Sequence, residues 1–206
     1  MKQYKFNDAH YGTHNLIAEE VGCGEDILDV GCNKGYLKNL SKENNFYGID
    51  FDESDLRLAK KNGYVEVYRV DLNKYEEFYS NKKFGAIIFG DVLEHLMYPP
   101  EVLEYFIKNY LKDNGRIIIS LPNVANIIVR FNLLLGKFNY TDSGILDKTH
   151  LHLYTTKTAI SLIRCAGLKI IKRKFSSNIF GFIIKKIPLL GDLLGFNLIF
   201  VCQRKY

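Results

Sequence analysis

Short apolar runs alternate with amphipathic segments along most of this chain, and that alternation is the feature that most limits its fold. Apolar runs of strand length, each followed by a segment of helix length, are typical of βαβ units. Such units build a largely parallel sheet whose strands are buried on both faces. We therefore expect an α/β fold. A chain of 206 residues suits one such domain and leaves little room for a second.

The apolar runs and the segments between them give the expected elements. The expected strands are 27–30, 46–50, 65–70, 84–89, 116–121, 168–172 and 198–202. The expected helices are 34–42, 53–61, 100–111, 127–135 and 155–166. Two stretches interrupt the alternation, one near 123–150 and one near 178–195. We expect 1–206 to form one domain in which these two stretches are insertions.

Composition excludes several classes of protein. Hydrophobic residues make up 47% and charged residues 25% of the chain, which is the balance of a globular protein and not of a disordered or collagen-like one. The four cysteines form no Cys-x-x-Cys pair, so we expect reduced thiols and a cytoplasmic location. Segment 1–8 lacks the apolar core of a signal peptide, which agrees with that location.

Basic charge is concentrated near the carboxyl terminus. Residues 169–206 carry a net charge of +7, which leaves −2 for the rest of a chain whose net charge is +5. A protein that coats nucleic acid would spread its basic residues more widely, so the charge pattern disfavours nucleic acid as a partner. The charge pattern indicates instead an acidic-to-neutral body with a basic, apolar end.

The segment 27–36 is the most informative part of the chain, because a strand there runs into a glycine turn and then a helix. A dinucleotide-binding fingerprint would need glycine at positions 31, 33 and 36, and Asn33 and Tyr36 break it. The actual pattern is Asp29-x-Gly31-x-x-x-Gly35. An acid at the strand end repels a pyrophosphate and suits a ligand that carries an amino group and a sulfonium. This pattern opposes a nicotinamide-dependent dehydrogenase.

Segments 29–35, 48–50, 70–72 and 90–96 together resemble, in order and spacing, motifs of the class I S-adenosylmethionine-dependent methyltransferases. The resemblance covers roughly 14–172. It implies a Rossmann-like, seven-stranded, mostly parallel sheet with an antiparallel closing strand and helices on both faces. It also implies S-adenosylmethionine as cofactor, S-adenosylhomocysteine as product and no metal. The positions that it assigns to the cofactor are Asp29, Gly31, Cys32, Gly35, Asp50, Phe51, Asp71, Leu72, Gly90 and Asp91.

Individual roles follow from the same resemblance. The acid matched by Asp50 accepts hydrogen bonds from the ribose hydroxyls, and the segment that contains Asp71 flanks the adenine. Each of these acids also has a plain structural interpretation, because either can cap the helix that follows it. Asn33 stands where many members of the family carry glycine, and asparagine also tolerates a positive φ. We therefore expect the turn to be kept.

Methyl transfer to a hydroxyl requires removal of its proton, and histidine is suited to that role near neutral pH. His95 lies five residues after Gly90, beyond the carboxyl end of a central strand, where parallel sheets bind ligands. We predict that His95 is the general base. The alternative is that His95 only caps or packs while Glu94 is solvated.

A second polar group precedes the helix at 155–166. It contains Asp147, His150 and His152, and the segment resembles a stretch in the branch near the ubiquinone-biosynthesis O-methyltransferases, a branch often found with bacterial surface-sugar synthesis. We predict that Asp147 and His150 face the substrate and contribute to catalysis. The two histidines share a face only in an extended segment, in which Asp147 points the other way. We therefore expect no metal site here.

The apolar segment 178–195 carries the basic pair Lys185 and Lys186. Three interpretations are open: contact with the inner membrane surface, a cover over the substrate pocket, or a contact between copies. We expect O-methylation of a small-molecule, sugar or glycolipid acceptor. A non-catalytic module that binds S-adenosylmethionine and an RNA methyltransferase are the alternatives, although the chain lacks the aromatic and basic interleaving typical of RNA binding.

Overall fold

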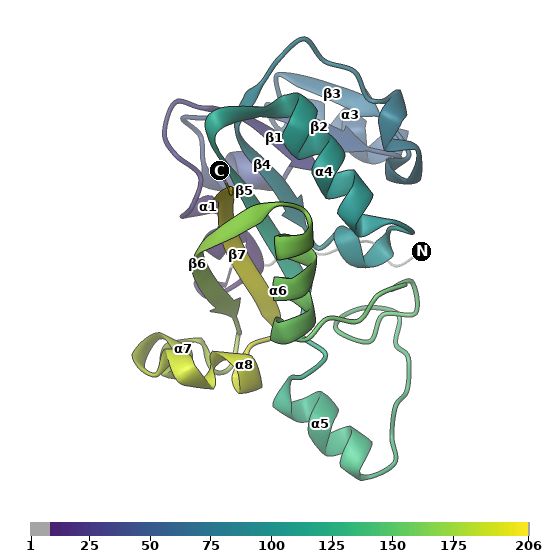
Figure 1. Cartoon of the computed structure of the whole chain (residues 1–206), viewed down its shortest axis with the longest axis vertical. Coiled ribbons are helices and arrows are strands. Elements are labelled where there is room, and N and C mark those ends of the chain that lie inside the picture. Colours follow the sequence, from purple (N-terminus) through teal and green to yellow (C-terminus); the bar gives the residue numbers. More distant parts are fainter. Residues whose placement is uncertain (1–8, 206) are drawn as a thin grey trace.

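A seven-stranded sheet with helices on both faces forms the body of the protein, as seen in a computed structural model that describes residues 9–205 (Figure 1). Segment 1–8, in which no signal-peptide core is expected, lies outside the described residues. The strands are β1 (Asp26–Val30), β2 (Asn45–Asp50), β3 (Glu66–Arg69), β4 (Phe84–Gly90), β5 (Leu111–Pro122), β6 (Leu168–Ser176) and β7 (Asn197–Arg204).

The strand order is β3-β2-β1-β4-β5-β7-β6. Strands β1 to β5 pair in parallel, and β7 is antiparallel to both of its neighbours, β5 and β6. The expected Rossmann-like sheet with an antiparallel closing strand is therefore confirmed. Each expected strand is present, with bounds that differ by a few residues at the ends.

The five expected helices are present, one of them shorter than expected, and the described residues contain six further short helices and 3₁₀ turns that were not expected. They are α1 (Thr13–Ala18), α2 (Leu37–Leu40), η1 (Leu72–Glu77), α3 (Glu53–Lys61), η2 (Leu93–His95), α4 (Pro99–Tyr110), α5 (Ile127–Leu134), α6 (Thr156–Cys165), α7 (Gly181–Lys186), η3 (Pro188–Leu190) and α8 (Gly191–Leu194). The helix expected at 34–42 shrinks to α2. Asn33 and Gly35 have positive φ values of 47° and 74°, which a right-handed helix does not allow.

Two apolar layers hold the helices to the sheet. Alternate side chains of one strand point to opposite faces, so that Phe89 packs against Phe106 of α4 while Ile88 joins the layer that contains Ile17 of α1. This burial on both faces explains why β4 reads as a nearly continuous apolar run. Among residues 9–205, no helix is both long and apolar enough to cross a membrane.

The carboxyl ends of the parallel strands meet at one edge of the sheet, and the segments that leave them gather there. These segments include the turn at 31–36 after β1 and η2 after β4. Helix α5 follows β5 and α7 follows β6, so the two stretches that interrupt the alternation emerge at this edge as well (Figure 1). The two asparagines that begin this region tie it together, because Asn126 donates to the Gly195 carbonyl and Asn123 donates to the Asp192 carbonyl.

Candidate functional site

A cavity of about 1060 Å³ opens at the carboxyl edge of the sheet. Nine of the ten positions assigned to the cofactor line it: Asp29, Gly31, Cys32, Asp50, Phe51, Asp71, Leu72, Gly90 and Asp91. Helix α1 adds Thr13 and His14 to the wall, a contribution that no sequence motif indicated. The cavity is thus built from the ends of four neighbouring strands and closed on one side by α1.

The glycine turn forms one wall of the cavity by close backbone packing. A Cβ atom on Gly31 would lie 2.0 Å from Cγ2 of Val92, so no larger residue fits there. Gly35 is the tenth assigned position, and it does not line the cavity. It packs behind the turn, where an added Cβ would lie 2.8 Å from Cα of Ala59. Asn33 keeps the turn with its positive φ, as expected from its residue type.

Asp50 holds the turn and faces the cavity at the same time. One carboxylate oxygen accepts a hydrogen bond from the Asn33 amide at 2.9 Å, and the other accepts from the Asp52 amide at 3.1 Å. A carboxylate has about four lone-pair positions, so two remain for further donors. Asp52, and not Asp50, caps α3, and the capping interpretation of Asp50 is therefore wrong.

Asp29 is 4% exposed, and its carboxylate accepts a hydrogen bond from the Tyr64 hydroxyl at 2.6 Å. Burial raises the pKa of Asp29 to about 7; the bond from Tyr64 opposes this rise and the nearby charge of Asp50 adds to it. A buried carboxyl that ionises near neutral pH is well matched to a cationic ligand. Tyr64 lies 35 positions along the chain, outside any motif, and sequence reasoning missed it.

Asp29→Asn is expected to stabilise the ligand-free protein at pH 8 and to leave it unchanged at pH 4. The raised pKa means that the native state binds more protons than the unfolded chain between about pH 4 and pH 7, so Asp29 lowers stability as the pH rises through that window. Asparagine keeps an acceptor for Tyr64 and removes the charge. We expect the melting temperature of the variant to exceed that of the wild type at pH 8 by several degrees, about 2–4 °C per kcal/mol.

A matched control lies on the same strand. Hydrogen bonds from Asn45 and Lys82 outweigh the partial burial of Asp26 and lower its pKa. Asp26→Asn should therefore give no gain in melting temperature at pH 8. An equal gain in both variants would contradict the assignment of a destabilising charge to Asp29.

Asp71 and Asp91 line the cavity and also fix local structure. Asp71 accepts a hydrogen bond from the Asn73 amide at 2.9 Å and caps η1, so its capping interpretation is confirmed. One oxygen of Asp91 accepts from the Ser120 hydroxyl at 2.5 Å and from the Asn197 amide group at 2.6 Å. Burial raises the pKa of Asp91, and these bonds tie the end of β4 to β5 and β7.

His95 lines the cavity from η2 and contacts the segment that follows α5. Its Nδ1 lies 3.1 Å from the Thr149 carbonyl oxygen, and its ring centroid lies 4.8 Å from that of His150. Nδ1 of His150 in turn lies 3.1 Å from the Ile145 carbonyl oxygen. A carbonyl only accepts, so each Nδ1 carries the proton and each Nε2 keeps a lone pair. Burial, followed by the nearby charge of His95, lowers the pKa of His150.

Glu94 is buried, which contradicts the solvated Glu94 of the alternative interpretation. Its exposed fraction is 1%, and neither carboxylate oxygen has a hydrogen-bond partner within residues 9–205. The backbone explains the burial, because the Glu94 carbonyl accepts from the amides of Leu151 and His152 and the chain at 151–152 thus lies over η2. Burial, and then the charge of Asp91, raises the pKa of Glu94 well above its ordinary value.

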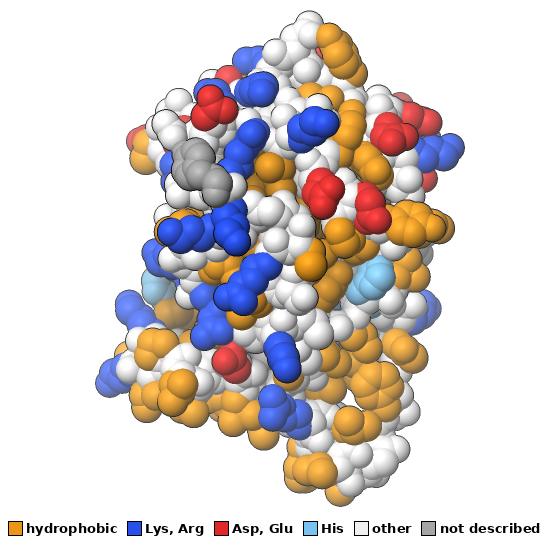
Figure 2. All heavy atoms as spheres, viewed as in Figure 1, with side chains coloured by type: hydrophobic (Ala, Val, Ile, Leu, Met, Phe, Trp, Pro, Cys, Tyr) orange, Lys and Arg blue, Asp and Glu red, His pale blue; other side chains and the backbone are white. Residues whose placement is uncertain are grey.

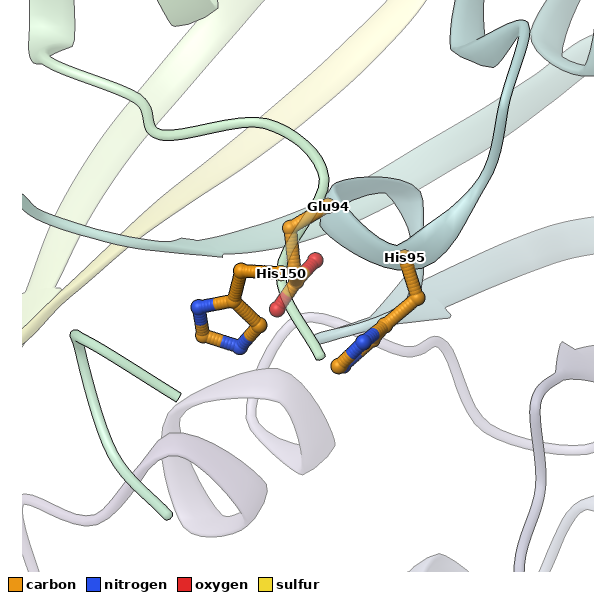
Figure 3. Close-up of side chains that lie close together, drawn as sticks. All are labelled: Glu94, His95 and His150. Carbon is orange, nitrogen blue, oxygen red and sulfur yellow. The ribbon is translucent and has the colours of Figure 1, made fainter. Parts of the chain in front are cut away.

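The side chains of Asp147, His150 and His152, the polar residues before α6, have different partners in the structure. Asp147 accepts from the amide and hydroxyl of Thr149, at 2.8 and 2.7 Å. His152 points elsewhere, with Nε2 3.0 Å from the Leu96 carbonyl oxygen. Neither Asp147 nor His150 lines the cavity, whereas Thr149 does. The ring of His150 therefore lies beside His95 and Glu94 (Figure 3), while its backbone amide donates to the Asp147 carbonyl.

The segment 178–195 contributes no residue to the cavity. Several of its apolar side chains are exposed, among them Ile179 (76%), Phe182 (59%) and Leu189 (86%). Helix α5 exposes Phe131 and Leu134 in the same way. Figure 2 shows apolar side chains gathered at the end of the molecule where α5 and α7 lie. A cover over the cavity is therefore not the arrangement seen for 178–195.

Comparison with solved structures defines the class of fold. A TehB-like S-adenosylmethionine-dependent methyltransferase from Corynebacterium glutamicum has a TM-score of 0.60 and 21% identity, over 95% of this chain and 88% of that one. The N-methyltransferase NodS from Bradyrhizobium japonicum, solved with S-adenosylhomocysteine, has a TM-score of 0.63 and 14% identity, over 96% of this chain and 86% of that one. The chain thus has the class I S-adenosylmethionine-dependent methyltransferase fold.

Sequence comparison gives the family. Residues 12–181 match the family described as methionine biosynthesis protein MetW, and the chain belongs to that family. It is 30% identical over 142 residues to an uncharacterised protein of Methanocaldococcus jannaschii, covering 66% of this chain and 53% of that protein. It is 31% identical over 106 residues to the mitochondrial ubiquinone biosynthesis O-methyltransferase of Candida albicans, covering 47% of this chain and 32% of that enzyme. The chain spans about half, or less, of these curated relatives.

Proposed function

We propose that the protein binds S-adenosylmethionine in the cavity and transfers its methyl group to an oxygen of an acceptor. Asp50 gives this proposal its main support. It lines the cavity at the end of β2, and its carboxylate keeps lone pairs that can accept hydrogen bonds from the two ribose hydroxyls of the cofactor. Asp29 then lies at the turn to receive the ammonium group of the cofactor. Phe51 and Leu72 line the adenine side. The Asp29 carboxylate at the turn would repel the pyrophosphate of a dinucleotide.

Isothermal titration tests the class of cofactor. We expect S-adenosylhomocysteine to bind with one site per chain and NADH not to bind, because Asp29 would repel its pyrophosphate and Asn33 and Tyr36 break the dinucleotide-binding fingerprint. S-adenosylmethionine should bind at the same site and compete with the product. Tight binding of NADH without binding of S-adenosylhomocysteine would contradict the proposal and favour a dehydrogenase.

The acceptor side of the cavity is formed by η2 and the segment before α6. Transfer from a sulfonium needs mainly the in-line placement of the acceptor oxygen. His95 is the catalytic residue that would accept its proton, since Nε2 keeps a lone pair while Nδ1 is held by Thr149. Asp147 orders Thr149 and acts as a positioning residue, and His150 packs against the ring of His95.

The exposed apolar end supports an acceptor at a membrane surface. We call the apolar side chains of α5 and of 178–195 the apolar end: Ile128, Phe131, Leu134, Ile179, Phe182, Ile183, Ile187 and Leu189. It lies at the same sheet edge as the cavity, and Lys185 and Lys186 add positive charge to it. Burial of apolar side chains and attraction to anionic lipid act together at such a surface. The chain then acts as one domain on a membrane-associated sugar or glycolipid. In this arrangement the segment 123–150 closes the acceptor side of the cavity.

Vesicle binding tests this contact. We expect the protein to sediment with vesicles that contain phosphatidylglycerol and to be released by salt, and we expect Phe182→Gln combined with Leu189→Gln to weaken sedimentation at least tenfold. In the bound protein both side chains would be buried in the membrane, and each would contribute about 1.5–3 kcal/mol to the free energy of binding. Their loss accounts for that effect. Leu58→Gln, on α3 and 39% exposed, is the control and should sediment as the wild type does. Equal sedimentation of all three proteins would contradict the contact.

A further inference from the structure

Three side chains with metal-ligating atoms converge beside the cavity. One ligand atom from each of Glu94, His95 and His150 lies within 4.8 Å of the other two. Figure 3 shows the two imidazole rings on either side of the Glu94 carboxylate. Two of the residues come from η2, and the third comes from the segment before α6. The fold therefore brings together residues that are more than fifty positions apart.

The hydrogen bonds of both histidines leave the same ring atom available. Nδ1 of His95 donates to the Thr149 carbonyl, and Nδ1 of His150 donates to the Ile145 carbonyl. Histidines that bind metal through Nε2 are held in this way by a carbonyl or carboxylate at Nδ1. The tautomer and the orientation of both rings are thus fixed as a metal ligand requires.

The buried Glu94 carboxylate also indicates a bound cation, independently of the two histidines. Its carboxylate is buried, and neither oxygen has a hydrogen-bond partner or an ion-pair partner among the described residues. Burial of a carboxyl group without any partner is costly, whether the group is charged or protonated. A cation bound between the carboxylate and the two imidazoles would remove that cost.

We propose that Glu94, His95 and His150 bind a divalent transition-metal ion. Two imidazole nitrogens and one carboxylate oxygen suit Zn²⁺, Co²⁺ or Fe²⁺, whereas Mg²⁺ and Ca²⁺ prefer all-oxygen sites. Three protein ligands leave at least one coordination position for water or an acceptor atom, as in catalytic zinc sites. The sequence did not indicate this site, because Glu94 was given no role and His150 was grouped with Asp147 and His152.

The role of the ion deepens the proposed function and rests on it. Because His95 also lines the cavity, an acceptor hydroxyl there lies within reach of the ion. The ion lowers the pKa of the bound hydroxyl, whose proton passes to water. The oxygen then forms its bond to the methyl carbon as the carbon–sulfur bond breaks, and the electron pair stays on sulfur. In this arrangement His95 holds the ion, and the ion takes over the removal of the proton.

Metal binding is measured on the untagged full chain after treatment with a chelator and without cofactor. We expect one Zn²⁺ per chain by isothermal titration, and visible absorption from Co²⁺ in the same site. Glu94→Gln and His150→Asn should each weaken Zn²⁺ binding at least tenfold. Glutamine has the shape of glutamate without its charge, and asparagine keeps a donor at the position of Nδ1 while removing Nε2. His152→Gln, which keeps the contact to Leu96, should bind Zn²⁺ as the wild type does.

The outcomes separate the metal site from the proposed function. Absence of stoichiometric Zn²⁺ binding to the wild type, or equal binding to the wild type and Glu94→Gln, would overturn the metal site and leave S-adenosylhomocysteine binding untouched. Binding of S-adenosylhomocysteine by each variant shows that it is folded. Zn²⁺ binding that depends on Glu94 and His150 in a protein without cofactor affinity would support the metal site and contradict the proposed function instead.

Discussion

Replacing Asp50 with alanine is expected to raise the dissociation constant of S-adenosylhomocysteine about 100-fold, which corresponds to about 3 kcal/mol. Two ribose hydroxyls would each lose a hydrogen bond to a charged acceptor, worth about 1.5–3 kcal/mol. The Asn33 amide would also lose the acceptor that holds the glycine turn. Isothermal titration of the wild type and the variant measures the change directly.

Two further variants separate the ribose contact from the turn. Asp50→Asn keeps an acceptor for one backbone amide and removes the charge, so it should weaken binding less than alanine does. Asp55→Asn removes a carboxylate from the same cavity wall without touching the turn, and it should bind S-adenosylhomocysteine within about threefold of the wild type. Unchanged affinity of Asp50→Ala would remove Asp50 from the cofactor site.

His95→Asn is expected to slow methyl transfer by about 100-fold to 10,000-fold while cofactor affinity changes little. Asparagine keeps the donor toward Thr149 and removes Nε2, the atom that would accept the proton or hold the ion. A single-turnover assay with methyl-labelled S-adenosylmethionine measures the rate, and titration with S-adenosylhomocysteine measures affinity in the same preparation.

His152→Gln is the control for this rate. His152 lies near η2 but is not part of the cavity wall. Glutamine keeps the hydrogen bond from this position to the Leu96 carbonyl. Its rate should equal that of the wild type. An undiminished rate in His95→Asn would remove His95 from the reaction, whereas a lost affinity for S-adenosylhomocysteine would indicate that His95 shapes the cavity and not the chemistry.

The fold was predictable because its information is local in the sequence. Apolar runs such as 84–89 show a buried strand without any knowledge of its neighbours. The helix expected at 34–42 was too long, since hydrophobic periodicity does not report the positive φ values that Asn33 and Gly35 need for the turn. At Gly35 the turn also passes so close to Ala59 that an added Cβ would lie 2.8 Å from its Cα atom.

The candidate site was predictable where consecutive strand ends supply it. Motifs such as Asp29-x-Gly31 stand at the carboxyl ends of strands, and parallel strands bring these ends to one edge. The partners that act across the fold were not predictable. The bond from Tyr64 to Asp29, the burial of Glu94 under 151–152 and the approach of His150 to His95 depend on tertiary packing that no spacing reveals.

Transfer of a labelled methyl group to a cellular acceptor is the direct test of methyltransferase activity. The protein is incubated with methyl-labelled S-adenosylmethionine and an extract of its source cells, and lipid, polysaccharide, RNA and small-molecule fractions are counted. We predict label in the lipid or polysaccharide fraction, reduced with Asp50→Ala at limiting S-adenosylmethionine and strongly reduced with His95→Asn. Label in RNA would favour an RNA methyltransferase. No label in any fraction, from a protein that binds S-adenosylhomocysteine, would contradict the account and indicate a non-catalytic binding module.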